Sequence, residues 1–243
     1  MFTRITTIIA LLSVLAAGFV VTMVALSSDY VVLRRDDFDE LVNYADSLER
    51  KLELTKLELS VLKRKVQKLE LLAEMRTQKG RYLVVDRAKG KFWIRDGKFV
   101  IYEGVCGVGK GVKWIRNKKF NFETPAGIYH VKRKLLNPWW IRPNWFWYER
   151  GLEVPKKWIR FPKNITFERA VAFYNSLSKE DKLRVRAIPG YLGKYVLDLG
   201  GGIFIHYSKH NRGAVSHGCI RVSEEDSEII WKLLDVGDPV YIF

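Results

Sequence analysis

The period of the hydrophobic pattern changes once along this chain, and the change separates two kinds of structure. Between Phe38 and Met75 apolar residues recur at heptad spacing, without any Gly or Pro. From Arg81 onward apolar and polar residues alternate instead, which is typical of strands that bury one face. We therefore expect a long helix, ended by residues 78–80, followed by a mainly β domain.

The heptad segment, over 36–78, is predicted to be a coiled-coil stalk. Its two sets of core positions are Phe38, Ala45, Leu52, Leu59, Val66 and Ala73, and Leu41, Leu48, Thr55, Leu62 and Leu69. Ten of these eleven residues are apolar, which favours a coiled coil whose simplest form is a parallel homodimer. The 38 residues from Phe38 to Met75 would make a helix roughly 57 Å long at ~1.5 Å per residue. The alternative is a single amphipathic helix that lies on the domain or on a bilayer.

An apolar stretch of 23 residues, 5–27, precedes the stalk and is interrupted only by small or hydroxyl residues. It is long enough to cross a hydrocarbon core of ~30 Å as a helix. Signal-peptide cores are shorter and no clear cleavage site follows, so an uncleaved transmembrane signal anchor is the better interpretation. Residues 1–4 would then be the cytoplasmic end.

The basic charge of the chain is concentrated in its second part. Residues 1–79 carry 12 Lys and Arg against 11 Asp and Glu, whereas residues 80–243 carry 30 against 16. A basic surface favours a polyanionic partner, such as anionic lipid headgroups or a cell-wall polymer. The chain shows no nucleic-acid-binding motif, so nucleic acid is not an expected partner.

Residues 80–243 are predicted to form one mainly β domain with a late helix. Asp96-Gly97 is a favoured hairpin turn between two of its strands. Ser223 begins a helix over 224–234, with a capping box that has Asp in place of Glu. Strands are expected at 81–86, 91–95, 98–105, 127–132, 195–199, 203–206 and 239–243.

Residues 133–190 interrupt these strands and are predicted to be an insertion. Its first part, 137–147, is rich in Trp and Pro, and its second part, 166–178, has the apolar spacing of a helix. The aromatic part is expected to form either a lid or wall that holds sugar or peptide, or a hydrophobic cluster beneath a long loop.

The residues that carry chemistry gather in Ser216-His217-Gly218-Cys219-Ile220-Arg221 and in Ile205-His206 shortly before it. A cysteine is nucleophilic as the thiolate, and a neighbouring imidazole supplies that state by accepting the proton. Gly218 lets backbone N–H groups approach a carbonyl oxygen closely, as an oxyanion site requires. Cys219 is therefore the candidate nucleophile and His206, at the end of an apolar strand, the candidate base. The other cysteine, Cys106, is expected to be a small buried apolar side chain.

These segments, taken in order, resemble the L,D-transpeptidases, the cysteine enzymes that cross-link bacterial peptidoglycan. The run from Ser216 to Arg221 matches the nucleophile segment, and 202–206 matches the strand that ends in the first histidine. Residues 124–127, Thr-Pro-Ala-Gly, match a Thr-Pro-x-Gly segment, while 81–86 and 236–242 look like the first strand and the closing turn and strand. The resemblance covers 80–243 and implies a β-sandwich or barrel with a few helices.

The resemblance also implies a reaction that needs no metal or organic cofactor. Cys219 would attack the carbonyl of the third, L-centred residue of a peptidoglycan stem tetrapeptide, and His206 would protonate the departing D-alanine. The supporting residues would be His217, Ser216 and Gly218, and the substrate-binding residues Arg221, Tyr207 and Ser208. Tyr207-Ser208 departs from the Gly that the family usually has after this histidine, which bears on acceptor preference.

Several outcomes remain for the acyl-enzyme and for the whole chain. An acceptor amine from another stem gives a 3→3 cross-link, a lipoprotein lysine or a D-amino acid gives attachment, and water makes the enzyme a hydrolase. A non-catalytic wall-binding spacer is the alternative outside enzymes. A wall substrate places the anchor in the cell (inner) membrane as a single pass, with the catalytic domain on the periplasmic side.

Overall fold

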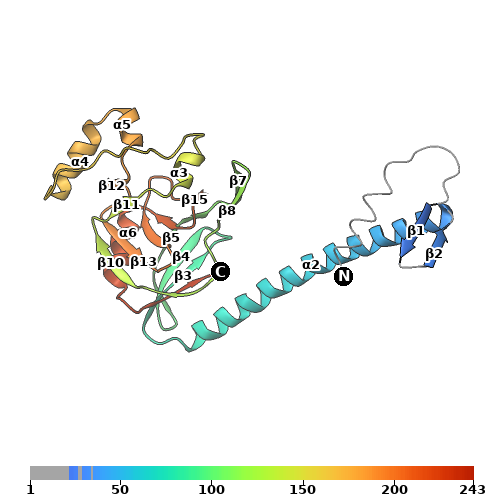
Figure 1. The fold of residues 1–243 in the computed structure, drawn as a ribbon. Coiled ribbons are helices and arrows are strands. Elements are labelled where there is room, and N and C mark those ends of the chain that lie inside the picture. Colours follow the sequence, from blue (N-terminus) through green and yellow to red (C-terminus); the bar gives the residue numbers. More distant parts are fainter. Residues whose placement is uncertain (1–21, 27–28, 34) are drawn as a thin grey trace. The chain divides into compact units, whose positions relative to one another are not determined.

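The computed structural model describes residues 22–26, 29–33 and 35–243 of the chain (Figure 1). The chain divides into two compact units, 1–65 and 66–243. The helices are α2 (Arg35–Thr77), α3 (Trp145–Tyr148), α4 (Phe167–Ser176), α5 (Lys179–Leu183) and α6 (Glu224–Leu233). The strands are β1 (Thr22–Leu26), β2 (Asp29–Leu33), β3 (Arg81–Asp86), β4 (Lys91–Asp96), β5 (Phe99–Val105), β6 (Gly107–Gly109), β7 (Gly111–Ile115), β8 (Lys118–Phe122), β9 (Gly127–His130), β10 (Arg133–Leu136), β11 (Trp139–Ile141), β12 (Ala187–Pro189), β13 (Tyr195–Asp198), β14 (Phe204–Tyr207), β15 (Gly213–Ser216), β16 (Ile220–Val222) and β17 (Pro239–Ile242).

Five strands form the first sheet of the β domain, in the order β5-β4-β3-β17-β9. β3, β4 and β5 follow one another antiparallel, whereas β17 lies parallel to β3. The loop between β4 and β5 is Gly97-Lys98, one residue later than predicted, because Asp96 pairs with Phe99. Gly97 has φ +54°, the left-handed conformation that a two-residue hairpin loop beginning with glycine requires.

Six strands form the second sheet, in the order β10-β13-β14-β16-β6-β15. At its centre β14 and β16 are parallel neighbours; His206 lies on β14, and Cys219 immediately precedes β16. The two sheets enclose one hydrophobic core, which confirms the mainly β fold. Its buried members include Leu83, Val85, Phe92, Ile94, Val240 and Ile242 from the first sheet and Val108, Leu197, Ile205, Ile220 and Val222 from the second.

Two smaller predictions about the β domain are confirmed. Cys106 is fully buried in the core, and burial raises the pKa of its thiol to about 12. Both cysteines are free. α6 begins where the capping box predicted, because the Ser223 hydroxyl oxygen accepts the N–H of Asp226 at 3.0 Å.

The insertion predicted at 133–190 contains β10 to β12 and α3 to α5. In Figure 1, α4 and α5 lie together, farther from the first sheet than β11 and β12 are. α4 begins at Phe167 because the Thr166 hydroxyl oxygen accepts the N–H of Arg169 at 3.4 Å. Trp147 is fully buried and donates its indole N–H to the Leu183 carbonyl oxygen at 2.9 Å. Part of the aromatic segment is therefore a hydrophobic cluster that holds the insertion together.

The predicted transmembrane anchor, 5–27, lies mostly outside the described residues. Its described part, 22–26, forms β1, which pairs antiparallel with β2 instead of extending a helix. Both strands contain β-branched residues, which favour extended backbone. Within the described ranges no helix has the length and apolar character that a membrane span requires.

α2 is one continuous helix over Arg35–Thr77, close to the predicted 36–78. Several of its predicted heptad core positions are exposed, including Leu41 at 55%, Leu62 at 56% and Leu69 at 65%. The predicted helix is therefore confirmed. A coiled coil also requires a partner helix, so it stays a prediction.

The last turns of α2 pack on the first sheet and belong to the unit 66–243. Leu71 is only 3% exposed and clusters with Tyr82, Val84 and Tyr241. The rings of Tyr82 and Tyr241 meet edge to face, with their centroids 5.6 Å apart. The end of the helix thus completes a second, smaller hydrophobic cluster of the β domain.

Replacing Leu71 with alanine is expected to lower the free energy of unfolding by about 3 kcal/mol, because the smaller side chain leaves a cavity in this cluster. Leu57→Ala on the same helix is the matched control, since Leu57 is 62% exposed and its loss should cost less than about 0.5 kcal/mol. Urea unfolding of both variants measures the difference. Equal stability of the two would show that the cluster does not hold the helix end.

Candidate active site

Cys219 lies in the turn that joins β15 to β16, and a buried serine shapes this turn. The Ser216 hydroxyl donates to the Cys219 carbonyl oxygen at 2.5 Å and accepts the N–H of Gly218 at 3.1 Å. Gly218 has φ +115°, and a Cβ there would lie 3.4 Å from the Glu123 carbonyl oxygen. The spacing Ser-x-Gly-Cys is therefore what this turn requires, because only glycine adopts that backbone conformation without strain.

The Thr-Pro-x-Gly segment holds the neighbouring strand in place. The buried Thr124 hydroxyl oxygen accepts the N–H of Gly109, the last residue of β6, at 2.8 Å. A side chain at Gly109 would come within 2.0 Å of the Phe122 carbonyl oxygen, so the two segments touch through their backbones. β6 lies between β16 and β15, so this contact fixes the strands on both sides of the catalytic turn.

His206 lies on β14, the strand next to the Cys219 turn. In the parallel pairing of β14 with β16, Ile205 lies opposite Ile220 and His206 opposite Arg221. Cys219 immediately precedes Ile220, so it lies level with Phe204 in this register. Phe204 and His206 share a face because side chains alternate along a strand. The topology therefore brings Cys219 and His206, the nucleophile and base expected from the resemblance, to one face of neighbouring segments.

The imidazole of His206 is held in one tautomer by a backbone carbonyl. Its Nδ1 lies 2.8 Å from the Tyr207 carbonyl oxygen. A carbonyl only accepts hydrogen bonds, so Nδ1 carries the proton and Nε2 of the neutral ring keeps its lone pair. His206 is 3% exposed, which keeps the ring rigid. The position where the family usually has glycine thus serves the site through its backbone.

The thiol of Cys219 is in its resting position. Its Sγ donates to the Gly202 carbonyl oxygen at 3.7 Å, and among the described residues no hydrogen bond joins Sγ to His206. Burial raises the pKa of the Cys219 thiol, against the Phe204 N–H and the positive charge of Arg221, which lower it. Burial also lowers the pKa of His206 to about 4. At neutral pH the two groups are therefore a neutral thiol and a neutral imidazole, which suits general-base activation of the sulfur.

A comparison with known protein families identifies this domain. The family model of the L,D-transpeptidase catalytic domain (YkuD) matches residues 80–242. The chain belongs to the L,D-transpeptidase catalytic domain family. No curated protein sequence matches it.

Three similar solved structures are also L,D-transpeptidases, and each is distant in sequence. An Enterococcus faecium L,D-transpeptidase mutant is 18% identical over 68% of this chain and 50% of its own, with a TM-score of 0.41. An L,D-transpeptidase from Mycobacterium smegmatis is 16% identical over 67% and 58%, with a TM-score of 0.41. One from Xylanimonas cellulosilytica is 16% identical over 69% and 62%, with a TM-score of 0.42. This chain thus spans less than two thirds of each.

Three predicted substrate or supporting residues of the L,D-transpeptidase domain make local hydrogen bonds. Arg221 donates from Nη1 to the Val215 carbonyl oxygen at 2.9 Å, which fixes the guanidinium beside the turn. Ser208 accepts the backbone N–H of His210 at 3.3 Å. Within the described part of the chain neither Ser208 nor Ser216 bonds to an imidazole, and both hydroxyls bond to backbone groups of their own turns. The positive charge of Arg221 still acts at the site, where it lowers the pKa values of Cys219 and His206.

His217 lies in the catalytic turn, and its ring is enclosed by residues that the sequence analysis did not identify. Trp145 stacks on the ring with the centroids 3.8 Å apart, and Phe122 meets it edge to face at 4.5 Å. Nε2 of His217 lies 2.8 Å from Oε2 of Glu149, whose other oxygen binds Lys110. Trp145 and Glu149 come from the insertion, so its aromatic part also builds a wall of the active site.

The two buried histidines of the L,D-transpeptidase domain are expected to make its stability fall in acid. Burial lowers the pKa values of both His206 and His217 to about 4, below the 6.5 of an unfolded chain. Stability is thus complete above pH 6.5 and is lost as pH falls toward 4, because only the unfolded state takes up the protons. Each histidine should cost about 2 kcal/mol between pH 7.5 and pH 5.

Urea unfolding at pH 7.5 and pH 5 measures this loss. His206→Gln should reduce it by about half, whereas His210→Gln, at an exposed position, should leave it unchanged. A loss that is the same in both variants would contradict the assignment to buried histidines.

Proposed function

We propose that this chain is a membrane-anchored L,D-transpeptidase that acts on peptidoglycan stem tetrapeptides through an acyl-enzyme on Cys219. The observation that supports this most directly is the arrangement on β14 and β16. Cys219 and His206 share one face of two parallel strands, and the Tyr207 carbonyl leaves Nε2 of His206 as the basic atom. A thiol, a base and a group that orients the base are the parts that covalent acyl transfer needs.

The first half of the reaction forms the acyl-enzyme. The Cys219 side chain turns from the Gly202 carbonyl toward His206, and Nε2 accepts the thiol proton as Sγ attacks the peptide carbonyl. The Gly218 N–H is engaged by Ser216, so we assign the oxyanion to the Cys219 N–H. The imidazolium of His206 then protonates the leaving nitrogen, the C–N bond breaks, and D-alanine departs.

The second half transfers the acyl group to an amine. The acceptor nitrogen attacks the thioester and gives a proton to Nε2 of His206. The C–S bond then breaks, and His206 passes that proton to the thiolate. A diamino acid side chain on a second stem gives a 3→3 cross-link. Water in place of the amine gives hydrolysis on the same scaffold.

Incubation with purified tetrapeptide stems tests the proposal. Mass spectrometry should show a Cys219 adduct and release of D-alanine, and a labelled D-amino acid added to the mixture should be retained in the product. Unlabelled, shortened peptides alone would mean that the enzyme is a hydrolase. Failure to form any adduct would favour a wall-binding spacer without catalysis.

We also propose that residues 5–27 anchor the chain in the cell (inner) membrane as a single pass, with the catalytic domain on the periplasmic side. The proposal rests on the 23-residue apolar stretch, which would have to form a helix in a bilayer in place of the β1 pairing, and on the position of the substrate outside the membrane. Protease treatment of spheroplasts tests it, since an external domain should be digested while the membrane stays intact. Protection of the domain would contradict this orientation.

The exposed heptad positions of α2 support a parallel homodimer through this helix. Leu62→Lys places a charge in the proposed seam, whereas Leu57→Lys places it outside the seam at a similarly exposed position. Sedimentation of the full chain in detergent should give a monomer for the first variant and a dimer for the second. A monomeric wild type would exclude the dimer.

A further inference from the structure

Glu149 links the insertion to the catalytic turn. It follows α3 directly, and its Oε2 lies 2.8 Å from Nε2 of His217, two residues before Cys219. Its Oε1 lies 2.5 Å from Nζ of Lys110. The side chains of all three residues are more than four-fifths buried, at 17% or 18% exposure. A carboxylate that is this well enclosed and doubly bonded is fixed in position.

The ring of His217 has little freedom to turn. It lies flat on Trp145, with an interplanar angle of 17°, and Phe122 closes its edge at 83°. The Glu149 carboxylate accepts hydrogen bonds only, so Nε2 of the neutral ring must carry the proton and Nδ1 must keep the lone pair. The described residues supply no hydrogen-bond partner for Nδ1.

Three charged groups act on His217 besides its burial. Glu149 favours the protonated ring, whereas Lys110 and Arg221 oppose it. Burial raises the pKa of Glu149. The hydrogen bonds and positive charges of Lys110 and His217 together lower it by more, so the net pKa lies below its ordinary value. Glu149 is therefore a carboxylate at neutral pH, as the tautomer argument requires.

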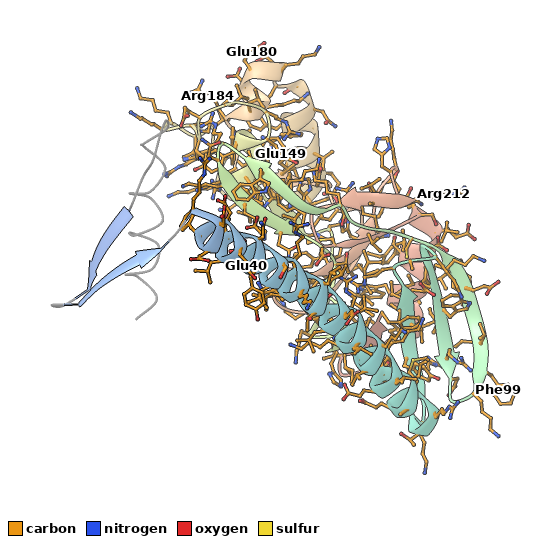
Figure 2. All side chains as sticks on the ribbon, turned by 90° about the vertical axis from the view of Figure 1, so that its right-hand side faces the viewer. Glu40, Phe99, Glu149, Glu180, Arg184 and Arg212 are labelled. Carbon is orange, nitrogen blue, oxygen red and sulfur yellow. The ribbon has the colours of Figure 1, made fainter. Side chains whose placement is uncertain are left out.

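Glu149 also faces an open space. A cavity of about 460 Å³ is lined by Lys113, Trp114 and Ile115 of β7 and by Glu149 and Arg150 of the insertion. Figure 2 shows Glu149 on the side of the domain toward α5, where Glu180 and Arg184 lie, and far from Phe99 at the β4–β5 turn. Glu149 thus contributes both to the wall of this cavity and to the contact with His217.

We propose that Glu149 is a positioning residue, which holds His217 as the Nε2–H tautomer so that Nδ1 accepts a hydrogen bond from an N–H of the bound peptide. The proposal rests on the proposed transpeptidase function. Its physical content is that the insertion sets which ring nitrogen of the catalytic turn is the acceptor. If the contact between Glu149 and His217 only held the insertion against the sheet, the choice of His217 tautomer would not affect the reaction.

Glu149→Gln separates these two roles, because a glutamine side chain keeps the size and can donate to Nε2. The ring is then expected to carry its proton on Nδ1 instead, which the ¹⁵N chemical shifts of His217 report. We expect kcat/KM for the tetrapeptide to fall about 10- to 100-fold, while the midpoint of thermal unfolding stays within a few degrees of wild type. Glu149→Asp, which retains the carboxylate, should recover part of the activity.

Glu153→Gln is the matched control on the same insertion, because Glu153 is exposed and pairs with Arg116 at the surface. It should change neither the ¹⁵N shifts nor kcat/KM. A Glu149→Gln variant that keeps the Nε2–H tautomer, or that keeps wild-type kcat/KM in an active enzyme, would overturn the proposal. If the wild type releases no D-alanine, the proposed function fails, and the ¹⁵N shifts still decide whether Glu149 sets the tautomer.

Discussion

Replacing Cys219 with serine is expected to abolish acyl-enzyme formation and to reduce D-alanine release at least about 10³-fold. A serine hydroxyl is a far weaker acid than a thiol, and the buried imidazole of His206, with a pKa of about 4, is too weak a base to compensate. The fold should survive, since the turn is held by Ser216 and Gly218 rather than by the sulfur. Mass spectrometry after incubation with tetrapeptide or a carbapenem measures the adduct.

Cys106→Ala is the control for this experiment. Cys106 lies in the hydrophobic core with a thiol that burial keeps protonated, so the variant should still form one adduct at Cys219. An adduct that persists in the Cys219 variant, or one that disappears with Cys106, would place the nucleophile elsewhere.

Replacing His206 with glutamine is expected to slow acylation by about 10²- to 10⁴-fold, because the amide cannot accept the thiol proton. The pH profiles should differ as well. In the wild type the rate should fall as pH drops through about 4, where His206 becomes protonated. In the variant only direct ionisation of the thiol remains. Burial raises the pKa of that thiol above its ordinary value of 9.0, so the variant's rate should rise about tenfold per pH unit through the alkaline range.

Stopped-flow acylation by a carbapenem between pH 4 and pH 10 gives both profiles. His210→Gln serves as the control, since His210 is exposed in the loop between β14 and β15. Identical profiles for wild type and His206→Gln would show that another group takes the proton, and the His217 ring would be the next candidate.

The fold of the β domain was largely predictable because each of its strands has a pattern that can be recognised in a few neighbouring residues. Alternation of apolar residues located β3, β4 and β5 to within a residue, and the Ser223 cap located the start of α6. The hairpin turn was misplaced by one residue, because the pairing of Asp96 with Phe99 is set by the register of two whole strands. The predicted anchor includes Thr22–Leu26, which the structure pairs with Asp29–Leu33 as a strand. Hydropathy alone does not reveal this pairing.

The candidate site was predictable only in part. Cys219 and His206 stand in short, recognisable segments, and parallel pairing of their strands brings them to one face. The group that orients His206 is the Tyr207 carbonyl. Every residue has a backbone carbonyl, so the sequence cannot show which one bonds to the imidazole. The partners of His217 lie at 110, 122, 145 and 149, far from it along the chain. Only the run of aromatic residues in the insertion hinted that a wall would form there.

The sequence by itself determined the catalytic elements, the alternation that builds two sheets and the heptad helix, because each depends on residues that are neighbours along the chain. The tertiary structure decided the protonation of the site, the direction in which the thiol rests and the contact of Glu149 with His217. These depend on burial and on the distances between charges. Both quantities come into existence only when segments that are remote in the chain are packed together.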